Sequence, residues 1–176
     1  MLRVVAFMLA VLVAFPAAAV DFLGDAKDGF ATVGVSADLR KGSGRDKVVI
    51  TLDQTKVIAA VPMMKEGGLL NPEITQTYVN THQVMVCGVV AITSSQAAMI
   101  QLYKTQKDVD NIDVSIVINY PDDYGNDKQE KLISFSFDRA LFQKINWEKL
   151  QPAKFMKIAP AFKFSQWYGA RMQEEQ

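Results

Sequence analysis

Two segments of the chain, IDVSIVINY (residues 112–120) and KLISFSF (131–137), decide the expected fold. In each segment every second side chain is apolar over most of its length, which is the pattern of a β-strand with one face in the core. The segment between them, PDDYGND (121–127), is rich in turn-forming residues. The pattern therefore predicts an antiparallel hairpin with one buried face.

More strands and helices are expected before this hairpin. A second hairpin is predicted over 47–61, where two β-branched runs flank a short polar turn. The sequence Asn-Pro-Glu at 71–73 has the composition of a helix start. It predicts a helix over 72–82, followed by a buried strand over 83–91.

Helices are also expected at three later places in the chain. Ser94 or Ser95 is a candidate cap for one helix, and Asp138 for another that Pro152 limits. Pro160 is a candidate start for the last helix. Hairpins interspersed with helices predict a single α+β domain, with antiparallel β-hairpins packed against several helices.

The amino-terminal segment 1–19 has the composition of a secretory signal peptide. Arg3 is followed by an apolar run, a proline and a group of alanines that suits a signal peptidase. A membrane anchor is the alternative, but the apolar run is at the short limit for a spanning helix and Asp21 follows it. We expect a cleaved signal peptide at 1–19 and one exported domain at 20–176, periplasmic or secreted.

Composition and charge exclude several classes of protein. The 176 residues include 19 Lys+Arg and 19 Asp+Glu, and 49% are hydrophobic, which is typical of a globular protein rather than a disordered or strongly basic one. Cys87 is the only cysteine, so an intramolecular disulfide is impossible. An exported domain without disulfides fits a bacterial periplasm best.

Metal and cofactor chemistry has little support in the sequence. His82 is the only histidine, which excludes a zinc site with two histidines from one chain. His82, Met85 and Cys87 are soft or borderline ligands that suit Cu(I), but on a strand His82 would point away from the other two. We expect no cofactor and no metal, and a buried Cys87 thiol.

Motifs for covalent catalysis are also missing. The sequence contains neither a G-x-S-x-G elbow nor an S-x-x-K pair. Asp122 and Asp123 are the nearest candidates for an enzyme that uses carboxylates. An envelope enzyme is therefore kept as an alternative.

The stretch from 139 to 171 is strongly basic and aromatic. It holds seven Lys and Arg residues and one acidic residue, Glu148. Basic and aromatic side chains together suit a partner-binding surface, and the candidate partner-binding residues are Lys154, Lys157, Lys163 and Trp167. The other interpretation is that most of these aromatics belong to the core, with lysines at its solvated border.

An envelope protein is the expected partner of this surface. An anionic membrane surface is less favoured, and export argues against nucleic acid. The sequence thus predicts a non-enzymatic binding or accessory protein that docks an envelope partner.

One part of the chain resembles a known family. KVVITLDQTKV (47–57), NPEI (71–74) and VMVCG (84–88) are similar to the small amino-terminal domain of bacterial secretin-associated pilus-assembly proteins. The similarity covers at most 47–103 and departs after Gly88, where Val89-Val90-Ala91-Ile92 stands in place of a Gly-Thr-Thr-Asn turn. The resemblance implies a role as a secretion or pilus-assembly accessory factor.

Overall fold

One mixed sheet of five strands organises the chain. The computed structural model describes residues 22–24, 26–42 and 44–175, and the predicted signal peptide lies outside them. The sheet order is β1-β2-β3-β4-β5, with β2 and β3 parallel and the other neighbours antiparallel. The strands are β1 (Val35–Arg40), β2 (Asp46–Asp53), β3 (Asn111–Pro121), β4 (Asp127–Asp138) and β5 (Lys163–Phe164).

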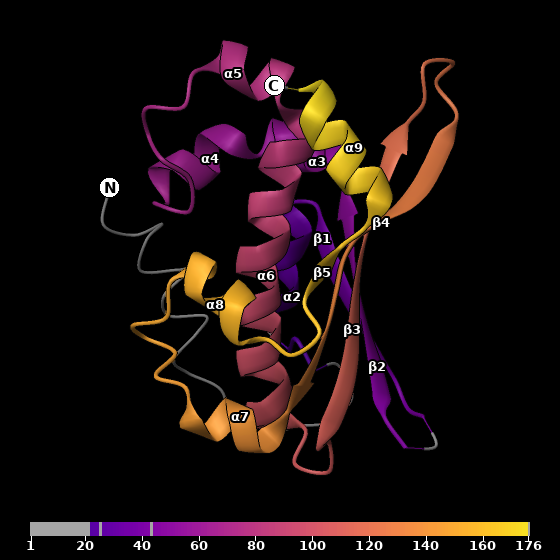
Figure 1. Cartoon of the computed structure of the whole chain (residues 1–176). Helices are drawn as coiled ribbons and strands as arrows, with labels where there is room; N and C mark the ends of the chain where they lie inside the picture. The colour runs from indigo at the N-terminus through magenta and orange to yellow at the C-terminus, as the bar shows by residue number, and fades with distance from the viewer. Residues whose placement is uncertain (1–21, 25, 43, 176) are drawn as a thin grey trace.

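The helices gather over one face of the sheet, and the longest of them, α6, runs along it (Figure 1). This arrangement confirms the predicted α+β fold. In chain order the helices are α2 (Ala26–Thr32), α3 (Gln54–Ala59), α4 (Val61–Glu66), α5 (Gln76–Thr81), α6 (Gln83–Thr105), α7 (Arg139–Lys144), α8 (Pro152–Ile158) and α9 (Gln166–Glu174).

The hairpin predicted from 112–120 and 131–137 is confirmed as β3 and β4. Its register shifts between the pairs Ile116↔Ile133 and Val117↔Lys131, so Leu132 is an extra residue in β4. Such a β-bulge lets two successive side chains face the same side of a sheet. Both Leu132 and Ile133 are accordingly buried.

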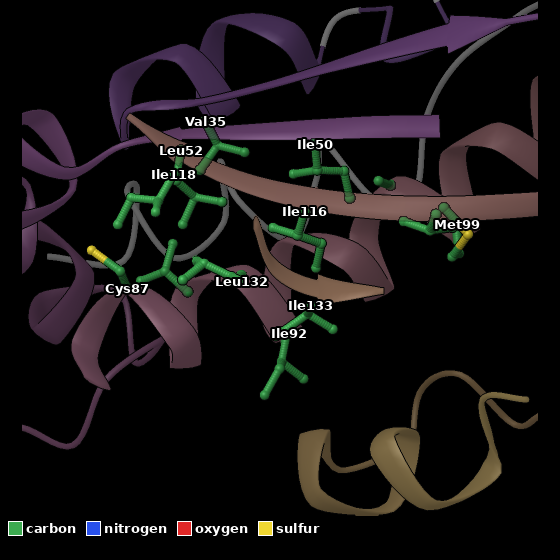
Figure 2. Packing of buried hydrophobic residues seen from close by; sticks show 14 of the residues in the cluster. Val35, Ile50, Leu52, Cys87, Ile92, Met99, Ile116, Ile118, Leu132 and Ile133 are labelled. Carbon is green, nitrogen blue, oxygen red and sulfur yellow. The ribbon is translucent and has the colours of Figure 1, made fainter. Parts of the chain in front are cut away.

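The core lies between the sheet and α6. Figure 2 shows Ile50 and Leu52 of β2 and Ile116 and Ile118 of β3 pointing from the strands into this space. All four are fully buried, as expected for a sheet whose alternate side chains face one helical layer. The opposite face of β2 and β3 is only partly covered.

The second strand predicted within 47–61 is wrong, because that segment is helical. The Asp53 carboxylate accepts a 3.1 Å hydrogen bond from a backbone N–H of the first turn of α3. Val57, Val61 and Met64 then recur at helical spacing and are buried. The β-branched composition misled the prediction, and β2 instead pairs in parallel with β3 after a helical crossover.

The predicted strand over 83–91 is also wrong, because these residues form the first part of α6. Most residues of α6 are buried, and its partly exposed face includes the apolar Val89 and Ile100, so its sequence lacks the polar face by which a helix is recognised. Ser94 and Ser95 start no helix. They lie inside α6, where the Ser95 hydroxyl donates a 2.6 Å hydrogen bond to the Ala91 carbonyl.

Helix boundaries show smaller corrections. The helix predicted over 72–82 is shorter, because Thr75 caps α5 while Asn71 binds the backbone N–H of Glu73 in a turn. The Asp138 cap of α7 is confirmed, with its carboxylate 2.7 Å from the Leu141 nitrogen. Pro152 does not limit α7, because it occupies the first turn of α8.

The last helix starts later than predicted. Pro160 precedes β5, and the hydroxyl of Ser165 accepts a 3.0 Å hydrogen bond from the Tyr168 N–H to cap α9.

By length and composition α6 could cross a bilayer, which the sequence did not suggest. Its mean hydropathy reaches 1.5, and 61% of its most apolar window is buried against the rest of the protein. A core helix of a globular domain has the same properties.

Candidate functional site

The four predicted partner-binding residues fall on two surfaces. Lys154 and Lys157 are exposed and lie three residues apart on α8, with Phe155 buried beneath them. Neither lysine takes part in an ion pair with any residue that the structure describes. We call this pair the α8 lysines.

Lys163 and Trp167 lie apart from the α8 lysines. Lys163 is exposed on β5, and Trp167 is half-buried on α9. Figure 1 shows α8 and α9 beside different parts of α6, so the α8 lysines lie apart from Trp167.

Most aromatic side chains of the carboxyl-terminal region belong to the core. Phe135, Phe137, Phe155 and Tyr168 are buried, and the Phe135 and Phe155 rings meet edge to face at 5.3 Å. Within 139–171, Phe142, Trp147, Phe162 and Trp167 are partly buried and pack against the core, whereas Phe164 is 47% exposed. The core interpretation of these aromatics is therefore confirmed for most of them.

Trp167 lines a concave surface that was not predicted from the sequence. A cleft of about 610 Å³ lies between α9, the β3–β4 hairpin and the junction of α5 with α6. We call it the α9 cleft; its lining residues are Gln54, Asn80, Thr81, Gln83, Val84, Tyr120, Pro121, Asp122, Asp123, Lys128, Glu130, Trp167, Arg171, Glu174 and Glu175.

Two aromatic rings form one wall of the α9 cleft. The Tyr120 and Trp167 rings are 5.2 Å apart at an angle of 34°. The guanidinium carbon of Arg171 lies 5.9 Å from the centre of the Trp167 ring, within the range of a cation–π contact. Arg171 also pairs with Glu174 at 2.9 Å. The wall thus presents apolar ring surface next to fixed charges.

Asp122 holds the shape of the hairpin tip, which comprises residues 121–127. Its carboxylate accepts hydrogen bonds from the backbone N–H groups of Tyr124 at 3.0 Å and Asn126 at 2.8 Å. The backbone N–H of Asn126 is the main cause that lowers the pKa of Asp122 below its ordinary value. The carboxylate is thus ionised at neutral pH and committed to the turn.

The hairpin tip also presents the most exposed aromatic side chain of the described residues. Tyr124 is 91% exposed, between Asp123 and a glycine with a φ of +79°. Figure 1 shows the hairpin extending beyond the sheet next to α9. Tyr124 is therefore presented on an ordered turn beside the cleft.

Glu175 fastens the end of α9 to the start of α6. Its carboxylate accepts hydrogen bonds from the backbone N–H groups of Val84 at 2.9 Å and Met85 at 3.1 Å. His82, the residue before α6, makes no such bond with its side chain. A carboxylate at the positive end of a long helix is stabilising, so Glu175 fixes one rim of the cleft.

The copper ligands considered above do not converge. The His82 ring stacks on Tyr78 at 4.0 Å, the Tyr78 hydroxyl donates to the Met85 sulfur at 2.9 Å, and Cys87 is fully buried. On a helix, an offset of five residues directs Cys87 and His82 to different faces. Among the described residues no three His, Cys, Asp or Glu side chains are grouped as metal ligands.

The predicted burial of Cys87 is confirmed, although the residue lies on α6 rather than in a strand. Burial raises the pKa of the thiol from 9.0 to about 12. Since an unfolded thiol ionises at lower pH than the folded one, the contribution to stability is complete below pH 9 and falls as pH rises toward 12.

We therefore expect an alkaline loss of stability that depends on Cys87. Between pH 8 and 10.5, the free energy of unfolding measured in urea should fall by about 1–2 kcal/mol more for the native chain than for Cys87→Ala. Equal losses in the two proteins would show that the thiol ionises as easily in the folded state as in the unfolded one.

Comparison of the chain with protein-family models, with curated proteins and with solved structures finds no match. The resemblance to pilus-assembly proteins over 47–103 stays a prediction. Within it, residues 84–88 lie in α6.

Proposed function

We propose that this chain is an exported, non-enzymatic binding protein that docks an envelope protein partner through the α9 cleft. The observation that carries the proposal is the pairing of a concave surface with an aromatic wall. A volume of about 610 Å³ is within the range of ligand-binding clefts. Aromatic rings in such a position contribute a large part of the energy of many protein interfaces.

The side chains around the cleft favour a protein partner over nucleic acid. Five of the lining residues are acidic and two are basic, which is unfavourable for phosphate groups. Tyr124 adds an exposed ring on an ordered turn, and tyrosine is among the residues enriched at interface hot spots.

The α8 lysines are proposed to steer, from a distance, an acidic face of the partner that is separate from the segment entering the α9 cleft. Exposed charges contribute little to stability and act mainly on the rate of association. Their position outside the α9 cleft suits this role, because steering does not require direct contact with the bound segment.

The proposal is tested by recovering crosslinked partner with the tagged, full-length chain from the envelope fraction. Tyr124→Ala should lower recovery about tenfold with an unchanged melting temperature, since the ring makes little contact within the chain. Val89→Ala is the matched control, because Val89 is an exposed apolar residue outside the cleft lining.

The double charge reversal Lys154→Glu/Lys157→Glu should give weaker recovery that responds less to salt. Equal recovery with Tyr124→Ala, Val89→Ala and the unaltered chain would place docking elsewhere and remove the basis of the proposal.

A further inference from the structure

We propose that the segment of the partner that enters the α9 cleft is basic, with an arginine or lysine side chain that lies against the Tyr120–Trp167 wall and pairs with Asp123 and Glu130. This inference rests on the proposed function and adds the chemistry of the occupant.

The cations of the cleft all have partners of opposite charge, whereas some of its carboxylates do not. Both cations already have carboxylate partners: Lys128 pairs with Asp122 at 3.8 Å and Arg171 with Glu174 at 2.9 Å. The Glu175 carboxylate is bound to the first backbone N–H groups of α6.

Two carboxylates of the lining are left without such a partner. The side chains of Asp123 and Glu130 make no hydrogen bond or ion pair within the described part of the chain, and both residues line the cleft. The unmatched charge of the cleft is therefore negative. It is located beside the hairpin rather than at α9.

The aromatic wall supports the same occupant. The Arg171 guanidinium lies 5.9 Å from the centre of the Trp167 ring, and its charge is matched by Glu174 at 2.9 Å. Guanidinium and ammonium groups gain attraction from aromatic rings in addition to their ion pairs. A basic side chain thus meets both kinds of contact in one cleft.

Other kinds of segment fit the cleft less well. An acidic segment would bring like charges to Asp123 and Glu130, which is repulsive. An apolar segment would remove water from these carboxylates without replacing the lost hydrogen bonds, which is also unfavourable. Charge complementarity therefore selects the basic segment.

The test uses the full mature chain and two synthetic peptides, acetyl-Gly-Arg-Gly-Arg-Gly-amide and its analogue with glutamate in place of arginine. Titration calorimetry at low salt should detect binding of the arginine peptide only, and 0.5 M NaCl should weaken it. The variant Asp123→Asn/Glu130→Gln should weaken binding at least fivefold. The variant Asp38→Asn/Glu73→Gln is the control, because both residues are exposed acids outside the cleft lining.

Three results would overturn the inference: no binding of the arginine peptide at millimolar concentration, equal binding of both peptides, or equal weakening by both double variants. Sedimentation of the chain alone tests another occupant, since salt-sensitive self-association that Lys154→Glu/Lys157→Glu abolishes would identify a second copy in the cleft. If Tyr124→Ala still lowers recovery of the envelope partner in these cases, docking stands and only the basic occupant is wrong.

Discussion

Replacing Arg139 by methionine is expected to lower the free energy of unfolding by about 3 kcal/mol, the largest effect of any single change considered. The Arg139 guanidinium donates to the carbonyl of Tyr103 at 3.1 Å, to that of Gln106 at 2.6 Å and to that of Val109 at 2.6 and 3.1 Å. These carbonyls belong to the end of α6 and the loop that follows it.

The effect is large because these carbonyls lie at and just beyond the carboxyl end of α6. The last carbonyls of a helix have no partner within the helix, and a cation there also opposes the negative end of its dipole. The guanidinium of Arg139 additionally lies 5.1 Å from the centre of the Tyr103 ring. Methionine keeps the apolar stem but none of these interactions.

Two further variants isolate the contribution of the several N–H donors of the Arg139 guanidinium. Arg139→Lys keeps the charge but should recover less than half of the loss, because one ammonium group cannot reach three carbonyls with the same geometry. Lys144→Met removes an exposed cation from the other end of α7, the helix that Arg139 begins, and should change stability by less than about 0.5 kcal/mol. A similar small loss for Arg139→Met in urea unfolding would contradict the assigned role.

The second large effect is expected at Gly88, where α9 packs directly on α6. A Cβ atom added at Gly88 would overlap the Tyr168 hydroxyl and lie 2.7 Å from the ring carbon that carries it. Tyr168 is only 3% exposed, so the ring has little room to move away. Gly88→Ala should therefore destabilise the protein by about 2 kcal/mol, although alanine is the better helix former.

Gly169→Ala is the matched control for this substitution. Gly169 lies in α9, and nothing is within 4 Å of a Cβ atom placed there. Gly169→Ala should therefore stabilise the protein by up to about 1 kcal/mol. Adding Tyr168→Phe to Gly88→Ala removes the nearest atom and should restore part of the loss. Equal effects of the two glycine substitutions would show that the contact with Tyr168 does not limit the packing of α9.

The parts of the fold that followed from the sequence are those with a clear local period. β3 and β4 alternate buried and partly exposed residues, and the Asp138 cap stands directly before α7. α6 could not be recognised, because its partly exposed face includes apolar residues such as Val89, and its valines resemble a strand. The parallel pairing of β2 with β3 follows from that helix and was missed with it.

Only part of the candidate site was accessible to sequence reasoning. Trp167, Asp122 and Asp123 were singled out separately, and the structure brings all three to the α9 cleft. Tyr120 and Glu175 were missed, because their roles depend on contacts between segments far apart in the chain. The spacing of Arg171 and Glu174, three residues apart on a helix, was the one local signal for a fixed charge pair near the wall.

Docking at the α9 cleft is the central claim, and site-specific photocrosslinking in intact envelopes tests it most directly. A benzophenone side chain is placed either at position 124 on the hairpin tip or at position 158, where the exposed Ile158 lies on α8. One discrete adduct is expected from position 124 and none of the same mass from position 158. An excess of unlabelled chain should compete for this adduct, whereas the Asp123→Lys/Tyr124→Ala chain should not. The same adduct from both positions, or equal competition by both chains, would contradict docking at the cleft.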